Sequence, residues 1–164
     1  MVAWWRRRAE TPPTERGVVA VRQYDTSAVQ ALLAHRYPFL LVDRIDVIES
    51  AKHVVGIKQV SAGEWWADGS TAALMPFGLV LEALAQTSGA LVHDLAEGIQ
   101  GAVAYLMGAD CVRMRRQPRV GDELMLDVTL RLWRRGLCRT RGVATIRGNV
   151  VLTAALTTII RGER

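Results

Sequence analysis

The chain has 164 residues, of which 50% are hydrophobic and 23% are charged. This composition predicts one globular domain with a real core and excludes a disordered chain, because disorder requires low hydrophobicity and high charge. The formal net charge is +5. The longest apolar stretch, residues 74–92, contains Pro76, Glu82 and Gln86, so we expect no membrane-spanning helix. The N-terminal arginines precede no apolar signal region, so we expect a cytoplasmic protein.

In chain order, residues 1–23 are rich in Arg, Thr and Pro without a period, and we expect a flexible tail. A single domain is expected over residues 24–164. It opens with a short helix before Pro38, for which Thr26 or Ser27 supplies the N-cap. Two adjacent strands of a hairpin follow over residues 39–50 and 51–60, because both segments are rich in Val, Leu and Ile.

A loop then leads into a helix predicted over residues 79–98, built from good helix formers and ended by Gly98. After this helix the pattern favours strands, most clearly where apolar and polar residues alternate; these strands are predicted over residues 102–116, 124–133, 137–148 and 150–162. Because the helices are not interleaved between strands, we expect an α+β fold with an antiparallel sheet. The long helix is apolar nearly all round, so the sheet should curl around it.

The charge is unevenly distributed along the chain. Residues 24–112 carry a net charge of −6, whereas residues 113–164 contain twelve arginines and four acidic residues, a net +8. Such a basic surface attracts nucleic acid, phosphorylated cofactors or an acidic carrier protein, although charges on the solvated outer faces of strands would give the same pattern. Nucleic acid is the poorest of these partners, because aromatic residues are scarce among the arginines.

Two cysteines, Cys111 and Cys138, occur without a CxxC pair or a histidine at metal-ligand spacing. We therefore expect two free thiols, no disulfide framework, no metal and no other cofactor.

Glu82 and Gln86 are the strongly polar residues within the apolar helix, and their spacing places them on one helical face. They could hydrogen-bond each other or a second subunit to specify assembly. Alternatively, Glu82 is a general acid or base in an apolar environment. Residues 75–78 open the helix, where free backbone N–H groups favour a developing oxyanion. The combination suits chemistry at a thioester carbonyl.

Three motifs occur in order: HRYPFLLVDR at 35–44, MPFGLVLEALAQ at 75–86 and YLMGADCVRMRRQPRVGDEL at 105–124. Together they resemble the bacterial 3-hydroxyacyl-acyl-carrier-protein dehydratases. The resemblance implies a hotdog fold, in which an antiparallel sheet wraps a central helix. It also implies a homodimer or trimer of dimers with acyl tunnels at the dimer interface. The implied reaction is loss of water from a 3-hydroxyacyl chain on acyl carrier protein or coenzyme A.

The resemblance places the family's catalytic glutamate at Glu82. The family's catalytic histidine would fall at Asp68, and no histidine lies between His53 and His93. We therefore expect Asp68, buried beside two tryptophans, to serve as a substitute base, although aspartate is intrinsically weaker than histidine. The substrate-binding residues expected are Trp65, Trp66, Phe77, Gly78, Gln86 and His35. The carrier-docking residues expected are Arg113, Arg115, Arg116 and Arg119.

Two other functions stay open. A hotdog thioesterase needs one helix carboxylate, here Glu82 with Gln86, together with backbone amides, and needs no histidine. A non-catalytic hotdog subunit that binds the acyl carrier would also be consistent with the absent histidine.

Overall fold

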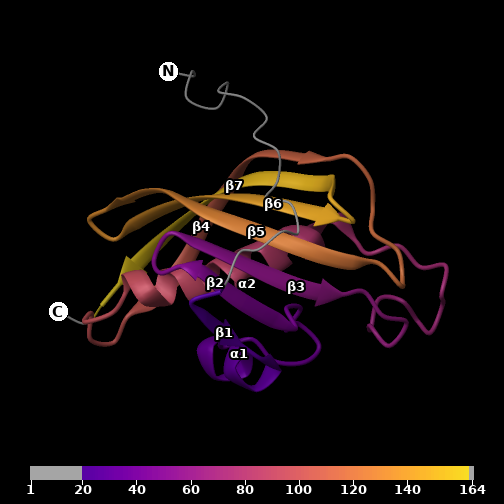
Figure 1. Ribbon diagram of the computed structural model, residues 1–164, viewed down its shortest axis with the longest axis horizontal. Coiled ribbons are helices and arrows are strands. Elements are labelled where there is room, and N and C mark those ends of the chain that lie inside the picture. The colour runs from indigo at the N-terminus through magenta and orange to yellow at the C-terminus, as the bar shows by residue number, and fades with distance from the viewer. Residues whose placement is uncertain (1–19, 163–164) are drawn as a thin grey trace.

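The computed structural model describes residues 20–162 (Figure 1). In that range, seven strands form one antiparallel sheet in the order β1-β2-β3-β5-β6-β7-β4. The elements in chain order are β1 (Arg22–Tyr24), α1 (Thr26–Leu32), β2 (Arg44–Glu49), β3 (His53–Gln59), α2 (Phe77–Leu95), β4 (Val103–Met114), β5 (Glu123–Arg134), β6 (Leu137–Ile146) and β7 (Asn149–Arg161). The predicted α+β class with an antiparallel sheet and one long helix is confirmed.

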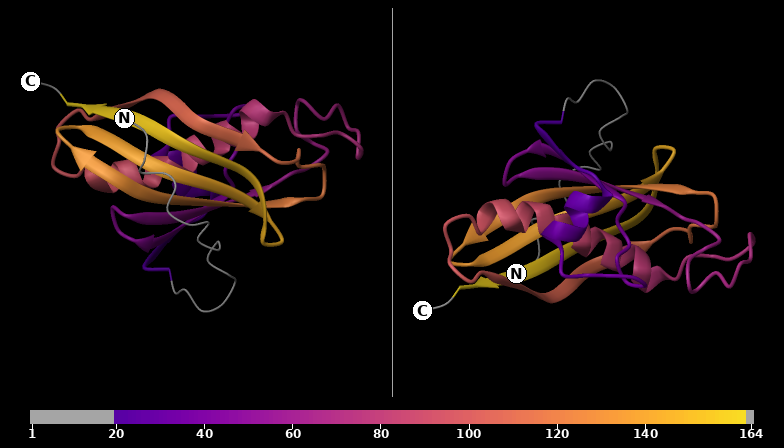
Figure 2. Two further views of the ribbon diagram at one scale, coloured as in Figure 1. Left: turned by 90° about the horizontal axis from the view of Figure 1, so that it is seen from above. Right: turned by 90° about the horizontal axis from the view of Figure 1, so that it is seen from below.

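The long helix α2 lies along one face of the curved sheet, with the short helix α1 beside it (Figure 2). Leu84 and Leu91 of α2 pack in the core with Leu124 and Leu126 of β5 and Leu152 of β7, and all five side chains are fully buried. This burial accounts for the apolar character of α2, because a helix covered on most faces has no need of a wide polar stripe.

The helix comes closest to the sheet at β3. A Cβ atom added at Gly56 would lie 2.3 Å from Oγ1 of Thr87 on α2. The Thr87 hydroxyl donates a hydrogen bond to the Ala83 carbonyl oxygen at 2.8 Å, which fixes it against the helix. Only glycine therefore fits at this point of β3.

The helix ends differ from the sequence expectations by a few residues. The carboxylate of Asp25 accepts a hydrogen bond from the Ala28 N–H at 2.8 Å, so Asp25 caps α1, and the prediction of Thr26 or Ser27 as the cap is wrong. The Thr26 hydroxyl instead donates to the Asp43 carbonyl oxygen at 2.9 Å. Helix α2 ends at Leu95, before Gly98, which has a φ of +83°.

The first strand begins inside the segment expected to be a tail. Residues 1–19 lie outside the described residues, but Arg22 pairs with Val47 and Tyr24 pairs with Ile45. Strand β1 is thus a three-residue edge strand of the sheet, paired with β2. Its two first residues belong to the predicted tail of residues 1–23.

Among residues 20–162, the structure has no helix with the length and hydropathy needed to cross a membrane. Cys111 is exposed and Cys138 is buried, and both are free thiols. Burial raises the pKa of the Cys138 thiol to about 11.

Candidate active site

The candidate site is organised around Gln86, which is 2% exposed in the middle of α2. Its Oε1 accepts a hydrogen bond from the Leu41 N–H at 2.9 Å, and its Nε2 donates to the Phe39 carbonyl oxygen at 2.7 Å. Nε2 also donates to Oε1 of Glu82 at 2.8 Å. Gln86 therefore joins the segment before β2 to the helix and orients the Glu82 carboxyl group.

His35 approaches the same carboxyl oxygen as Gln86. Its Nε2 is 3.3 Å from Oε1 of Glu82, and the two side chains are 41% and 24% exposed, respectively. Its Nδ1 is buried and has no hydrogen-bond partner among the described residues. His35 lies three residues after the end of α1, in the segment that leads towards β2.

These three side chains line a cavity of about 890 Å³ that runs beside the second half of α2. Its other walls come from α1, β4 and β7 and include Leu33, Leu106 and Ile160. A space of this size with a few convergent polar groups is typical of a small-molecule binding site.

An ion pair lies at the end of the cavity farthest from Glu82 along α2. Arg22 of β1 pairs with Asp94 of α2, whose carboxylate also accepts hydrogen bonds from the Ser50 hydroxyl at 2.7 Å and the Ala51 N–H at 3.1 Å. Burial opposes ionisation of Asp94, but the hydrogen bonds from Ser50, Arg22 and Ala51 outweigh it and hold the pKa of Asp94 below its usual value.

The remaining predicted substrate residues lie at the start of α2 and in the loop before it. Gly78 is exposed in the first turn of α2, one turn before Glu82 on the same face. A Cβ atom added there would meet nothing within 4 Å. Phe77 and Trp65 are about half exposed, and Trp66 keeps a buried Nε1 without a partner among residues 20–162.

Asp68 is exposed in the same loop, with a φ of +48° that precedes the φ of +71° at Gly69. The expectation that Trp65 and Trp66 bury it is therefore wrong. Within the described chain, no hydrogen bond or ion pair joins Asp68 to Glu82, and Asp68 does not line the cavity.

The four predicted docking arginines are exposed at the end of β4 and in the loop that follows it; they are Arg113, Arg115, Arg116 and Arg119. This loop is tied to the chain just before α2. The Met75 N–H donates to the Pro118 carbonyl oxygen at 2.7 Å, and the Val120 N–H donates to the Ala73 carbonyl oxygen at 3.2 Å. The arginines and the first turn of α2 thus belong to one end of the molecule.

Sequence reasoning placed Glu82 and Gln86 together but gave His35 only a substrate-binding role. It did not find the two backbone groups that hold Gln86, at Phe39 and Leu41, or the Arg22–Asp94 pair. The motif at 35–44 marked the segment that contains Phe39 and Leu41, but not its contact with Gln86. A single sequence does not report which side chain a backbone amide meets 45 residues away.

Comparisons with known proteins show which family the chain resembles. Residues 33–155 match the FabA-like domain. The 3-hydroxyacyl-[acyl-carrier-protein] dehydratase FabZ of Geobacillus thermodenitrificans is 42% identical over 134 residues, which cover 80% of this chain and 92% of that protein. FabZ of Bacillus subtilis is 40% identical over 135 residues, which cover 81% and 95% of the two chains.

Solved structures share the fold at lower identity. The dehydratase heterocomplex ApeI:P from Xenorhabdus doucetiae has a TM-score of 0.67 at 21% identity, over 82% of this chain and 91% of that one. A hypothetical thioesterase with coenzyme A from Streptococcus pneumoniae has a TM-score of 0.55 at 19% identity, over 70% and 83%. These likenesses confirm the hotdog fold. The sequence match over most of both chains settles the family: this chain belongs to the FabA-like domain family, together with the dehydratases named FabZ.

Proposed function

We propose that this protein removes water from 3-hydroxyacyl thioesters carried on acyl carrier protein, with Glu82 as the acid that protonates the leaving hydroxyl group. The observation that carries the proposal is the Glu82 carboxyl group, oriented by Gln86 at the wall of the 890 Å³ cavity. The relatives at about 40% identity are named for this reaction, and the cavity has room for an acyl chain.

Gly78 supplies the group that would polarise the thioester carbonyl. Its N–H lies in the first turn of α2, where backbone N–H groups have no acceptor within the helix. The open space beside its Cα lets a substrate approach the backbone closely. Phe77, its neighbour in the chain, and Trp65 in the preceding loop offer exposed apolar surface for the arm that carries the thioester. The role of Asp68 as the base stays a prediction.

The β4 edge supports assembly as a homodimer, alone or as a trimer of dimers. β4 is twelve residues long, lies at the edge of the sheet and exposes Val103, Tyr105, Leu106 and Met107. A long apolar edge strand left unpaired is prone to aggregate. Pairing with the same edge of a second copy would cover it by a two-fold axis and would close the cavity along Val103 and Leu106, which line it.

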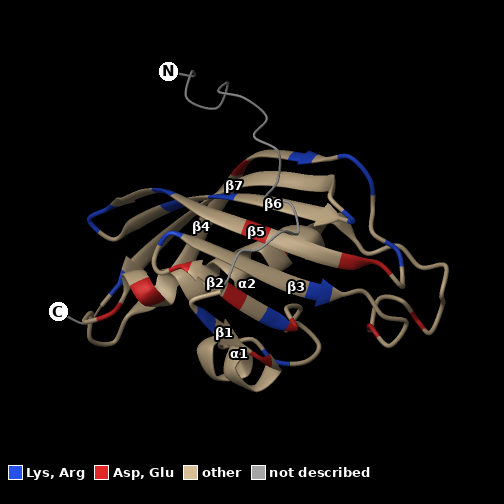
Figure 3. Ribbon diagram, in the orientation of Figure 1, with Lys and Arg blue, Asp and Glu red and all other residues tan. Residues whose placement is uncertain are grey.

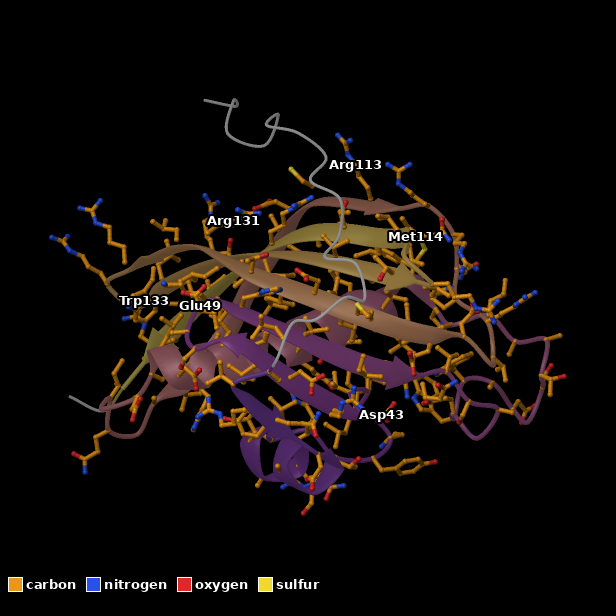
Figure 4. The ribbon with its side chains drawn as sticks, viewed as in Figure 1. Asp43, Glu49, Arg113, Met114, Arg131 and Trp133 are labelled. Atoms are coloured by element: carbon orange, nitrogen blue, oxygen red, sulfur yellow. The ribbon has the colours of Figure 1, made fainter. Side chains whose placement is uncertain are left out.

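The exposed arginines after β4 support docking of an acidic carrier protein. Figure 4 shows Arg113 and Met114 near one end of β4, away from Trp133 and Glu49 at the opposite end of the sheet. Arg115, Arg116 and Arg119 follow in the loop bonded to residues 73–75. A carrier bound there would deliver its arm to the first turn of α2. The two free thiols support work in a reducing cytoplasm.

The test is mass spectrometry of 3-hydroxyacyl carrier protein incubated with the purified enzyme. We expect the acyl carrier to lose one water, and the rate to fall by about 10²–10⁴-fold in Glu82→Gln, the range for loss of a general acid. Glu49→Gln, an exposed glutamate paired with Lys52 on the outer part of the sheet, is the matched control and should keep the wild-type rate. Release of free acid would show a thioesterase instead, and a bound but unchanged acyl carrier would show a non-catalytic subunit.

A further inference from the structure

We infer that His35 is the second proton-transfer group of the site and acts as the base that takes the C2 proton while Glu82 protonates the leaving hydroxyl. The inference rests on the proposed dehydration and adds a catalytic residue to it. Dehydration needs two groups at once, one to accept a proton from C2 and one to deliver a proton to the hydroxyl at C3. Within the described chain, the titratable side chain that meets Glu82 is His35.

The separation of the two groups suits the reaction. Two groups on one side of the substrate require a syn elimination, in which rotation about the C2–C3 bond of about 1.5 Å brings the C2 hydrogen and the C3 hydroxyl to the same face. His35 Nε2 and Glu82 Oε1 are 3.3 Å apart at the cavity wall, close enough to serve both substrate positions from one side. Asp68, in contrast, is exposed, and within the described chain no hydrogen bond or ion pair joins it to Glu82.

The two nitrogens of His35 are not equivalent. Nδ1 is buried without a partner among the described residues, whereas Nε2 lies beside the Glu82 carboxyl group. Nε2 is therefore the nitrogen available for proton transfer. The reaction starts from a neutral imidazole, which can accept a proton, and a protonated carboxyl group, which can donate one, and this assigns the C2 proton to His35 and the hydroxyl to Glu82.

The step balances as follows. His35 Nε2 takes the C2 proton, and the electron pair of the broken C–H bond forms the C2=C3 double bond. The C3–O bond breaks with its electron pair, and the oxygen takes the Glu82 proton and leaves as water. The proton on His35 then passes to the Glu82 carboxylate, which lies 3.3 Å away, and the pair returns to its starting state. No external oxidant, reductant or cofactor is needed.

His35→Gln tests this role, because the glutamine amide keeps a hydrogen-bond donor near the position of Nε2 but cannot take up a proton. We expect kcat for water loss to fall by about 10²–10⁴-fold, with KM much less affected and the unfolding temperature unchanged. The acid limb of the pH profile of kcat/KM should also disappear. His53→Gln is the matched control, since His53 pairs with Asp127 away from the cavity, and it should behave as wild type.

A merely positioning role would leave His35→Gln with the wild-type kcat and pH profile, and this result would overturn the inference. Loss of activity in Asp68→Asn with full activity in His35→Gln would assign the base to Asp68 instead. If His35→Gln is unstable, His35→Asn, which cannot take up a proton either, replaces it. In the double variant with Glu82→Gln, two groups of one proton-transfer unit should lose no more together than Glu82→Gln loses alone, and additive losses would overturn the inference. If the wild-type protein forms no enoyl product, the proposed function itself fails.

Discussion

At the scale of single residues, the polar groups near α2 fall into two kinds. Glu82 and His35 keep part of their surface open to the cavity, as groups that meet a substrate must. Asp94 is different, because its nearly buried carboxylate is occupied by Arg22, Ser50 and the Ala51 N–H. Although Asp94 also lines the cavity, its bonds join α2 to β1 and to the turn after β2. We therefore infer that Asp94 stabilises the fold and does not bind the substrate.

Asp94→Ala should lower the free energy of unfolding at pH 7 by about 1–3 kcal/mol, because it removes the charged acceptor that Arg22, Ser50 and the partly buried Ala51 N–H share. Since the folded state holds the pKa of Asp94 below its unfolded value, this contribution is present above the ordinary carboxyl pKa of about 3.9 and is lost as the pH falls through the lower folded value. Denaturant unfolding at pH 7 and below pH 4 measures both. Asp110→Ala, at a largely exposed carboxylate, should change stability little, and an equal loss there would contradict the assignment.

At the scale of elements, β4 has two functions in the proposed assembly. It is a wall of the cavity and also an edge strand whose side chains are mostly exposed. By contrast β1, at the other edge, is only three residues long and offers little to pair with. Of the two edges of the described sheet, β4 is the long and apolar one, which supports the proposed interface through β4.

Introducing positive charge on the exposed apolar side chains of β4 tests the proposed interface. Tyr105→Arg with Met107→Arg should convert the protein into a monomer, because four arginines would meet across a two-fold axis. Light scattering reads the mass directly. Leu132→Arg, at a similarly exposed apolar residue of β5, is the control and should keep the wild-type mass. A dimer that persists in the double variant would place the interface elsewhere.

At the scale of the whole molecule, two clusters of basic residues lie at opposite ends of the sheet. Figure 3 shows one group at the end of β4 and in the loop after it, and the other at the turn between β5 and β6. Arg134 and Arg135 belong to the second group. Only the first group is connected to the start of α2, through the hydrogen bonds of Met75 and Val120. We therefore expect the cluster after β4 to affect the carrier-bound substrate and the cluster at the β5–β6 turn not to.

Arg115→Glu with Arg116→Glu should reduce kcat/KM for the carrier-bound substrate by roughly tenfold or more at low salt, with a flatter salt dependence. The same variant should process a pantetheine thioester without the carrier at the wild-type rate, since its cavity is unchanged. Arg134→Glu with Arg135→Glu makes the same charge change at the far end and should leave both rates alone. Equal effects of the two double variants would show that only net charge matters.

The sequence predicted the architecture better than the site. Period-two alternation from Leu124 to Trp133 and the apolar helix around Glu82 each encode the local environment of their own residues, so β5 and α2 could be recognised. The three-residue strand β1 gave no such signal. Glu82 and Gln86 are one turn apart and their hydrogen bond followed from helical spacing. His35 comes to Glu82 across 47 residues of chain, through the packing of α1 beside α2 and the hydrogen bonds of Gln86 to Phe39 and Leu41.

The three hydrogen bonds of Gln86 have a consequence for how the site can be observed. The Leu41 N–H donates to the same amide group that orients Glu82. For the Leu41 N–H to exchange with solvent deuterium, its hydrogen bond to the Gln86 side chain must break. The exchange rate of this backbone hydrogen therefore reports how firmly Gln86, and with it the Glu82 carboxyl group, is held. An acyl chain that restrains Glu82 from the cavity would slow it. Hydrogen exchange at Leu41 would thereby report whether the cavity holds an acyl chain, although the substrate need not contact Leu41 itself.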